Sequence, residues 1–227
     1  MSTGSGPKAA DGPARRPPTV RTLLWTAFLG ALLVSGALRD GSPPRPTAAQ
    51  AGAPAAARAV PGAATPGAAA PGPAPLPDAA PVRIRIPAIK VDAFLTRLEL
   101  DPQGRLLPPP MTAPALAGWY ADGTAPGARG TAVVAGHVDT PYGPAVFHEL
   151  GALEKGAEIA VDRQDGRTAL FTVDAVEVHA KDAFPDARVY AGSTRPELRL
   201  ITCGGDWSKK TGYRANTVVY ATMSAVK

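Results

Sequence analysis

The composition of the chain changes at Pro81, and this change constrains the fold more than any other feature. Beyond Pro81 the sequence consists of short runs rich in Val, Ile, Thr and Phe, separated by turn-forming stretches such as 102–104 (PQG) and 165–166 (DG). Short runs of β-branched and aromatic residues between such breakers predict β-strands. The predicted strands cover residues 82–86, 94–100, 131–138, 157–162, 168–180, 197–203 and 216–224.

Only the segment 144–155 (PAVFHELGALEK) predicts a short helix. Its apolar residues recur at helical spacing and fall on one face; they are Val146, Phe147, Leu150 and Leu153. Many short strands with one short helix predict an all-β domain over residues 81–227. We expect this domain to be a closed or nearly closed β-barrel.

The first 38 residues divide into a basic tail and an apolar run. Residues 1–21 are polar and rich in Pro and Gly, which predicts a disordered tail. Residues 22–38 are 17 residues without a charge, about 26 Å long as a helix and close to a hydrocarbon core of about 30 Å. They predict a single-pass transmembrane signal anchor at the cell membrane, with the tail in the cytoplasm and the remaining chain extracellular. A signal peptide cleaved near residues 35–37 is the alternative, and it also exports the domain.

Residues 39–80 form a Pro/Ala/Gly-rich tract with almost no large apolar side chains. Such a tract buries too little surface to offset the entropy of ordering it, and its prolines favour extended backbone. We therefore expect a disordered spacer that holds the domain off a membrane. Because residues 1–80 contain no strand pattern, we also expect them to be dispensable for chemistry.

The charge distribution argues against a nucleic-acid partner. The first 80 residues contain seven Lys/Arg and three Asp/Glu, whereas residues 81–227 contain 17 basic and 16 acidic side chains. A nucleic-acid surface requires Lys and Arg clustered on the folded part of the chain. The predicted domain is nearly neutral and has no such cluster. The single cysteine of the chain also excludes an internal disulfide.

Three candidate catalytic residues lie at or beside the ends of predicted strands: Cys203, His137 and Arg214. A thiol becomes a good nucleophile when a nearby cation or imidazole stabilises or generates its thiolate. A guanidinium can also donate two hydrogen bonds to a developing oxyanion. Taken singly, a buried thiol, a structural histidine and a solvated arginine are the alternatives. We assign His148 and His179 to the structural class.

The segments AVVAGHVDT, LRLITCGG and GYRANTVVYA resemble the three signature segments of the sortase family. They are most similar to those of class F sortases from high-GC Gram-positive bacteria, and they occur in the family's order. The resemblance covers about residues 82–224. It implies an eight-stranded sortase β-barrel with an N-terminal anchor, Cys203 as the nucleophile, His137 as the acid/base and Arg214 as the substrate or oxyanion stabiliser. Thr202 and Asp139 lie inside the matched segments, and no role is assigned to them.

The resemblance also implies a reaction and its partners. Sortases cleave a C-terminal LPxTG-like sorting signal on secreted proteins through a thioester acyl-enzyme, and they transfer the protein to an amine of a cell-wall precursor. Some sortases bind calcium through an acidic cluster, which this sequence lacks, so we expect no cofactor and no metal. The alternatives are another cell-wall cysteine peptidase or transpeptidase and a non-catalytic wall-binding domain. A Ser-x-Gly-Cys segment, or a histidine after Cys203, would have favoured the other enzymes.

Overall fold

The computed structural model describes residues 41–51 and 72–227. The predicted basic tail and transmembrane anchor lie outside the described residues. Within the described part of the chain, no helix is both long and apolar enough to cross a bilayer.

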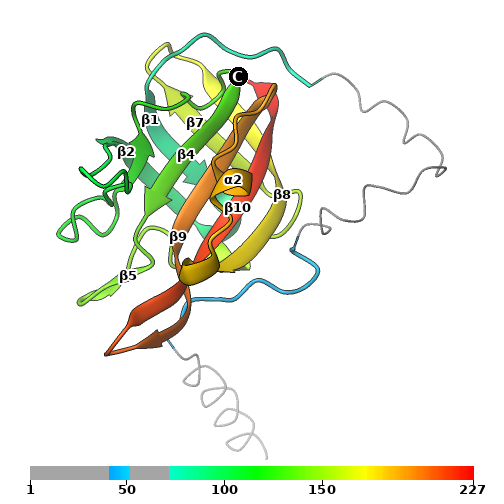
Figure 1. Ribbon diagram of the computed structural model, residues 1–227. Helices are drawn as coiled ribbons and strands as arrows, with labels where there is room; N and C mark the ends of the chain where they lie inside the picture. The colour runs from blue at the N-terminus through cyan, green and yellow to red at the C-terminus, as the bar shows by residue number, and fades with distance from the viewer. Residues whose placement is uncertain (1–40, 52–71) are drawn as a thin grey trace, which may run out of the picture. The chain divides into compact units, whose positions relative to one another are not determined.

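Eight strands close into a barrel in the order β1-β2-β3-β4-β9-β10-β8-β7 (Figure 1). The β2/β3 and β4/β9 pairs are parallel, and β1 closes the barrel against β7 in antiparallel pairing. The closed all-β barrel is therefore confirmed. The strands are β1 Pro81–Ile86, β2 Val91–Leu98, β3 Ala117–Tyr120, β4 Gly130–Gly136, β7 Glu158–Arg163, β8 Thr168–Ala180, β9 Pro196–Ser208 and β10 Gly212–Val226, with β5 Asp139–Thr140 and β6 Gly143–Pro144 forming a separate ribbon.

Helical structure is limited to single turns in the described residues. These are the 3-10 turns η2 Pro87–Ile89, η3 Leu150–Ala152 and η4 Lys181–Ala183, and the four-residue helix α2 Asp186–Val189. The helix predicted over 144–155 is therefore wrong in extent, because this segment consists of turns that end in η3. The apolar spacing was still informative, since Phe147, Leu150 and Leu153 are fully buried. Burial of each such side chain contributes about 1.5–3 kcal/mol relative to exposure.

Alternate residues of each strand separate an inner core from an outer apolar cluster. On β9, Leu198 and Leu200 belong to the inner core, where both are fully buried. Ile201 points to the opposite face and packs in the outer cluster with Val133 of β4. The outer cluster also contains Val189 of α2, so the segment between β8 and β9 covers part of the outer face of the barrel.

Two stretches of the predicted spacer pack on the barrel, which differs from the expectation of disorder over residues 39–80. Gln50 is buried, and Leu76 packs against the inner core. The backbone N–H of Leu76 donates to the carbonyl of Gly127 at 2.8 Å. The guanidinium of Arg163, which is buried, donates to the carbonyl of Pro77. A few anchoring side chains and backbone bonds thus order stretches whose composition alone predicts disorder.

Candidate active site

Parallel pairing of β4 with β9 brings His137 and Cys203 to the same end of the barrel. The ladder runs from Gly130 opposite Pro196 to Ala135 opposite Ile201. His137 directly follows the last residue of β4, and Cys203 lies two residues beyond Ile201 within β9. Residues two apart on a strand point to the same face. The Cys203 side chain therefore lies on the outer face, as that of Ile201 does.

The imidazole of His137 is oriented by a backbone carbonyl. Its Nε2 lies 2.7 Å from the carbonyl oxygen of Pro109. A carbonyl can only accept, so Nε2 carries the hydrogen, and in the neutral ring Nδ1 is the free acceptor. A neighbour that fixes one ring nitrogen leaves the other nitrogen available for proton transfer. The loop before β3 thereby leaves Nδ1 as the ring nitrogen of His137 that can exchange a proton with a substrate.

The thiol of Cys203 is half-buried and lies beside an ammonium group. Cys203 pairs with Asn216 across β9 and β10, and the Nζ of Lys181 is 3.8 Å from Sγ. Lys181 begins η4 directly after Ala180, the last residue of β8, which pairs with Ala215 of β10. A cation beside a thiol stabilises negative charge on its sulfur. Sequence reasoning did not single out Lys181.

Arg214 lies close to Cys203 along the sheet, within an irregularity of the β9/β10 ladder. Ala215 pairs with Gly204, and Tyr213 pairs with Trp207, so the register shifts at Arg214. Gly205 on the opposing strand has a φ of 77°, a value that favours glycine. Arg214 is exposed, and its guanidinium forms no ion pair among the described residues. It remains available to a substrate.

A hydrogen bond joins the β9–β10 hairpin to the segment that follows His137. The hydroxyl of Tyr213 donates to Oδ2 of Asp139 at 2.5 Å. Burial, followed by this hydrogen bond, raises the pKa of the Tyr213 phenol above its ordinary value. The phenol therefore stays protonated and remains a donor. Asp139, to which the sequence assigned no role, ties the two sides of the site together.

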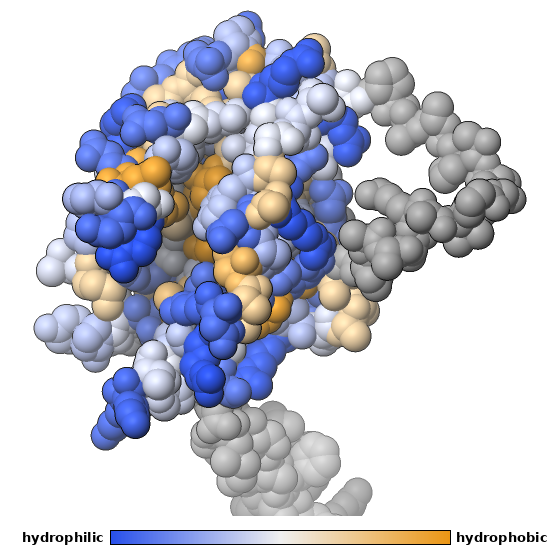
Figure 2. Space-filling model, in the orientation of Figure 1, coloured by the Kyte–Doolittle hydropathy of each residue, from blue (hydrophilic) through white to orange (hydrophobic). Residues whose placement is uncertain are grey.

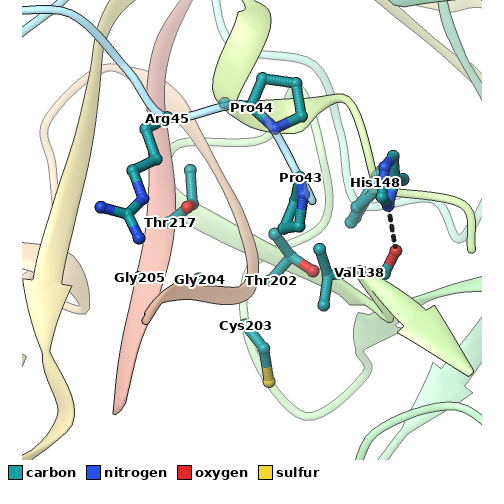
Figure 3. Close-up of a pocket in the computed structure, with 12 residues that line it drawn as sticks. Pro43, Pro44, Arg45, Val138, His148, Thr202, Cys203, Gly204, Gly205 and Thr217 are labelled. Carbon is teal, nitrogen blue, oxygen red and sulfur yellow. Dashed lines mark hydrogen bonds between the residues drawn. The ribbon is translucent and has the colours of Figure 1, made fainter. Parts of the chain in front are cut away.

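The other two histidines are held by partners of their own. His148 Nδ1 is 3.1 Å from the carbonyl of Val138, and its ring lines a small pocket that Cys203 also lines. Figure 3 shows that the Cys203 sulfur points away from His148. His179 contacts the Tyr220 hydroxyl at 3.0 Å, and burial lowers the pKa of its imidazole.

The described residues offer no cluster of three or more His, Cys, Asp or Glu side chains that could hold a metal ion. The groups that the site presents are the thiol of Cys203, the imidazole of His137, the ammonium of Lys181 and the guanidinium of Arg214. These groups come from four different strands or their ends: β4, β8, β9 and β10.

The sequence of this barrel matches a known protein family. The sortase domain family matches residues 84–224. The chain belongs to the sortase family. The match begins within β1, ends within β10 and includes His137, Cys203 and Arg214 of this sortase. A search of the curated proteins finds no match.

Solved structures of other sortases share the fold of this sortase. The SrtA sortase of Actinomyces oris is 18% identical with a TM-score of 0.50, and the alignment covers 69% of this chain and 88% of that one. Sortase A of Listeria monocytogenes is 17% identical with a TM-score of 0.49, with 66% and 90% covered. At these identities the likeness concerns the fold alone.

Proposed function

We propose that this sortase is a cysteine transpeptidase that cleaves an LPxTG-like sorting signal and transfers the protein to a cell-wall amine. The observation that carries the proposal is that, in a sortase domain, His137 and Cys203 lie at the same end of two neighbouring parallel strands. A nucleophile and an acid/base carried by adjacent strands can act on one peptide bond.

In the acylation step, the Cys203 thiolate attacks the carbonyl carbon of the signal's Thr and forms a C–S bond. The C–N bond to Gly then breaks, and imidazolium His137 gives its proton to the leaving amine. A thioester remains on Cys203. In the second step an amine, or water, attacks the thioester, the C–S bond breaks, and His137 takes the proton from the attacking group. Two acyl transfers thus replace one difficult amide exchange.

The two cations have different parts in this mechanism. Lys181 contacts the sulfur itself, so it stabilises the thiolate before attack. Arg214 is exposed opposite the turn that follows Cys203, where it donates hydrogen bonds to the oxyanion of the tetrahedral intermediate. Lys181 thus activates the thiolate before the reaction, whereas Arg214 stabilises the negative charge that forms on the substrate oxygen in the transition state.

The outer apolar cluster provides a surface for the apolar residues of the signal. Val133 on β4 and Ile201 on β9 are buried within this cluster, so the surface is formed by Leu106 and Phe184, which are partly buried and pack against it. Figure 2 shows apolar residues set in a depression near the middle of the face on which Figure 1 draws β4 and β9. The two strands run from this cluster toward His137 and Cys203. A peptide lying along them would bring its Thr-Gly bond to the thiol.

The same proposal includes the cellular setting. The uncharged run 22–38 would anchor the sortase in the cell membrane as a single pass, with residues 1–21 in the cytoplasm and the barrel outside. Its motifs are most similar to those of class F sortases, and we propose that class. In that setting, secreted proteins with a C-terminal signal and cell-wall precursor amines are the natural partners.

Cleavage of fluorogenic peptides with LPxTG-like and LAxTG-like sequences, with and without added amines, tests the proposal. The wild-type protein should cleave such a peptide and form a thioester visible as an added acyl mass on Cys203. Cys203→Ala should lose both signals and keep its circular dichroism spectrum. Retention of more than a few per cent of the activity in Cys203→Ala would remove the nucleophile assignment.

A further inference from the structure

Residues 43–51, here called the strap, belong to the same compact unit as the barrel. Gln50 anchors the strap: it is 8% exposed, and its Nε2 donates to the carbonyls of Gly151 at 3.1 Å and Leu153 at 2.5 Å. Its side-chain Oε1 accepts from the backbone N–H of Thr47, and its backbone carbonyl accepts a hydrogen bond of 2.9 Å from the backbone N–H of Val176 in β8. A buried amide with both kinds of partner satisfied is costly to displace.

The strap fits closely against η3. A Cβ built on Gly151 would lie 2.0 Å from the carbonyl oxygen of Pro44. Backbone cannot yield to such a clash, so only glycine at position 151 allows the strap to approach this closely. Both the polar anchor at Gln50 and the close approach at Gly151 therefore depend on the strap being docked.

The beginning of the strap lies behind the nucleophile. Pro43, Pro44 and Arg45 line one side of the small pocket that Thr202 and Cys203 also line. Figure 3 shows Thr202 next to Pro43, with the Cys203 sulfur pointing away from both prolines. The strap supports β9 from the side opposite the sulfur and leaves the sulfur open to a substrate.

Thr202 of β9 lies against the strap without forming a side-chain hydrogen bond. Thr202 is 4% exposed, and its Oγ1 has no hydrogen-bond partner among the described residues. Arg45 forms an ion pair of 2.5 Å with Asp206 on the β9–β10 hairpin. Because both of those side chains are exposed, that pair contributes little by itself.

The strap also reaches the histidine side of the site. The backbone N–H of Phe147 donates to the His137 carbonyl at 3.0 Å, and Phe147 lies three residues before η3. The strap therefore contacts both the segment bonded to His137 and the strand that carries Cys203. We propose that the strap is a positioning element of the active site, which holds the Cys203 sulfur in register with His137.

This inference rests on the proposed function for its catalytic readout. If the strap leaves its position, β9 gains freedom next to Cys203, and the sulfur spends less time in line with His137. Displacements of about 1 Å in an active site can cost 10²-fold in rate. The strap lies opposite the substrate side, so turnover should fall while substrate binding changes little.

The test uses Gln50→Ala, Gly151→Ala and the double variant in the full chain, with Gln164→Ala, an exposed glutamine at the β7–β8 turn, as the matched control. Hydrogen exchange at the Val176 amide reports whether the strap is docked. We expect faster exchange in the strap variants, with kcat lowered about tenfold or more and KM within about twofold. Rates are measured well below each unfolding midpoint, and Gln164→Ala should match the wild type in all three readouts.

Alkylation of Cys203 by iodoacetamide separates the two proposals. If the wild type cleaves no sorting peptide, the proposed function fails, but the strap variants should still react more slowly, by about twofold or more, because the sulfur is less often beside its activating neighbours. Faster exchange at Val176 with unchanged kcat and unchanged alkylation would overturn the positioning role. Unchanged exchange in the double variant would overturn the docking itself.

Discussion

At the scale of single residues, the structure adds a second cation beside Cys203. The motifs point to Arg214 as a substrate or oxyanion stabiliser, and the ammonium of Lys181 lies 3.8 Å from Sγ. Lys181 has no signal in the sequence, because it is one charged residue after a predicted strand. Only the order of strands in the sheet, with β8 beside β10 and β10 beside β9, brings it to Cys203.

Lys181→Met should reduce the reactivity of Cys203 in a way that depends on the charge of the reagent. A cation at the sulfur attracts anionic iodoacetate but not neutral iodoacetamide, so the iodoacetate rate should fall further. At an exposed site such an interaction is worth about 0.5–1 kcal/mol, a factor of about 2–5 in the ratio of the two rates. Lys209→Met, in the exposed hairpin, is the control. Equal losses for both reagents would contradict a direct role of the Lys181 ammonium.

His137→Ala should lower kcat/KM for peptide cleavage by about 100-fold or more, the usual contribution of a general acid–base group. His148→Ala and His179→Ala should stay near the wild-type value, because each ring is engaged by its own partners. Steady-state kinetics on one peptide substrate compares all three. If His148, which lines the pocket behind Cys203, proved to be the essential imidazole, the motif assignment would be wrong.

At the scale of elements, the strands were predictable where apolar and β-branched residues formed short continuous runs. The runs 131–138 and 197–203 became β4 and part of β9, whose residues are mostly buried on both faces. β3 was missed: it is only Ala117–Tyr120, and Gly118 is there because a Cβ would lie 2.4 Å from Leu98. Such a close approach depends on tertiary packing, which no local sequence pattern indicates.

The site was less predictable than the strands that carry it. The identities of His137 and Cys203 followed from the motifs, but their alignment depends on parallel pairing between strands 66 residues apart. The bond between Tyr213 and Asp139 likewise joins residues far apart in sequence. Long-range register of this kind is set by the whole barrel, which periodicity within one segment cannot specify.

His179 of β8 gives the stability of the barrel a predictable pH dependence. Burial, opposed by Glu177, lowers the imidazole pKa below 6.5 in the folded state. As the pH falls below 6.5, the unfolded chain therefore takes up this proton first, and the folded state loses stability until the pH passes the lower folded-state pKa. Above 6.5 the contribution is fully present.

His179→Gln should flatten this loss of stability, because glutamine does not titrate and still offers a hydrogen-bonding group to Tyr220. Urea unfolding midpoints measured across this pH range for the wild type and the variant give the comparison, with His148→Gln as the control. An equally steep decline in His179→Gln below pH 6.5 would assign the pH dependence to other groups.

At the scale of the whole molecule, the boundary of the catalytic unit lies further toward the N-terminus than composition indicates. Sequence reasoning placed it at Pro81, because residues 39–80 contain almost no large apolar side chains. The structure packs two stretches of that tract on the barrel, through Gln50 and Leu76. A low-complexity tract can thus contribute to a folded unit through a few anchoring residues.

Three truncations should therefore behave differently. A chain that starts at residue 41 should retain both wild-type stability and wild-type turnover, because it keeps all the packed stretches. A chain that starts at residue 72 loses the strap; it should fold, with kcat lowered about tenfold or more. A chain that starts at Pro81 also loses the Leu76 contacts and the Pro77 carbonyl that accepts from buried Arg163. Loss of that acceptor should lower the free energy of unfolding by a further ~1–3 kcal/mol, the cost of an unsatisfied buried donor.

Urea unfolding and peptide cleavage measured on the three proteins test these expectations. Equal stability and equal turnover in all three would return the boundary of the folded unit to Pro81.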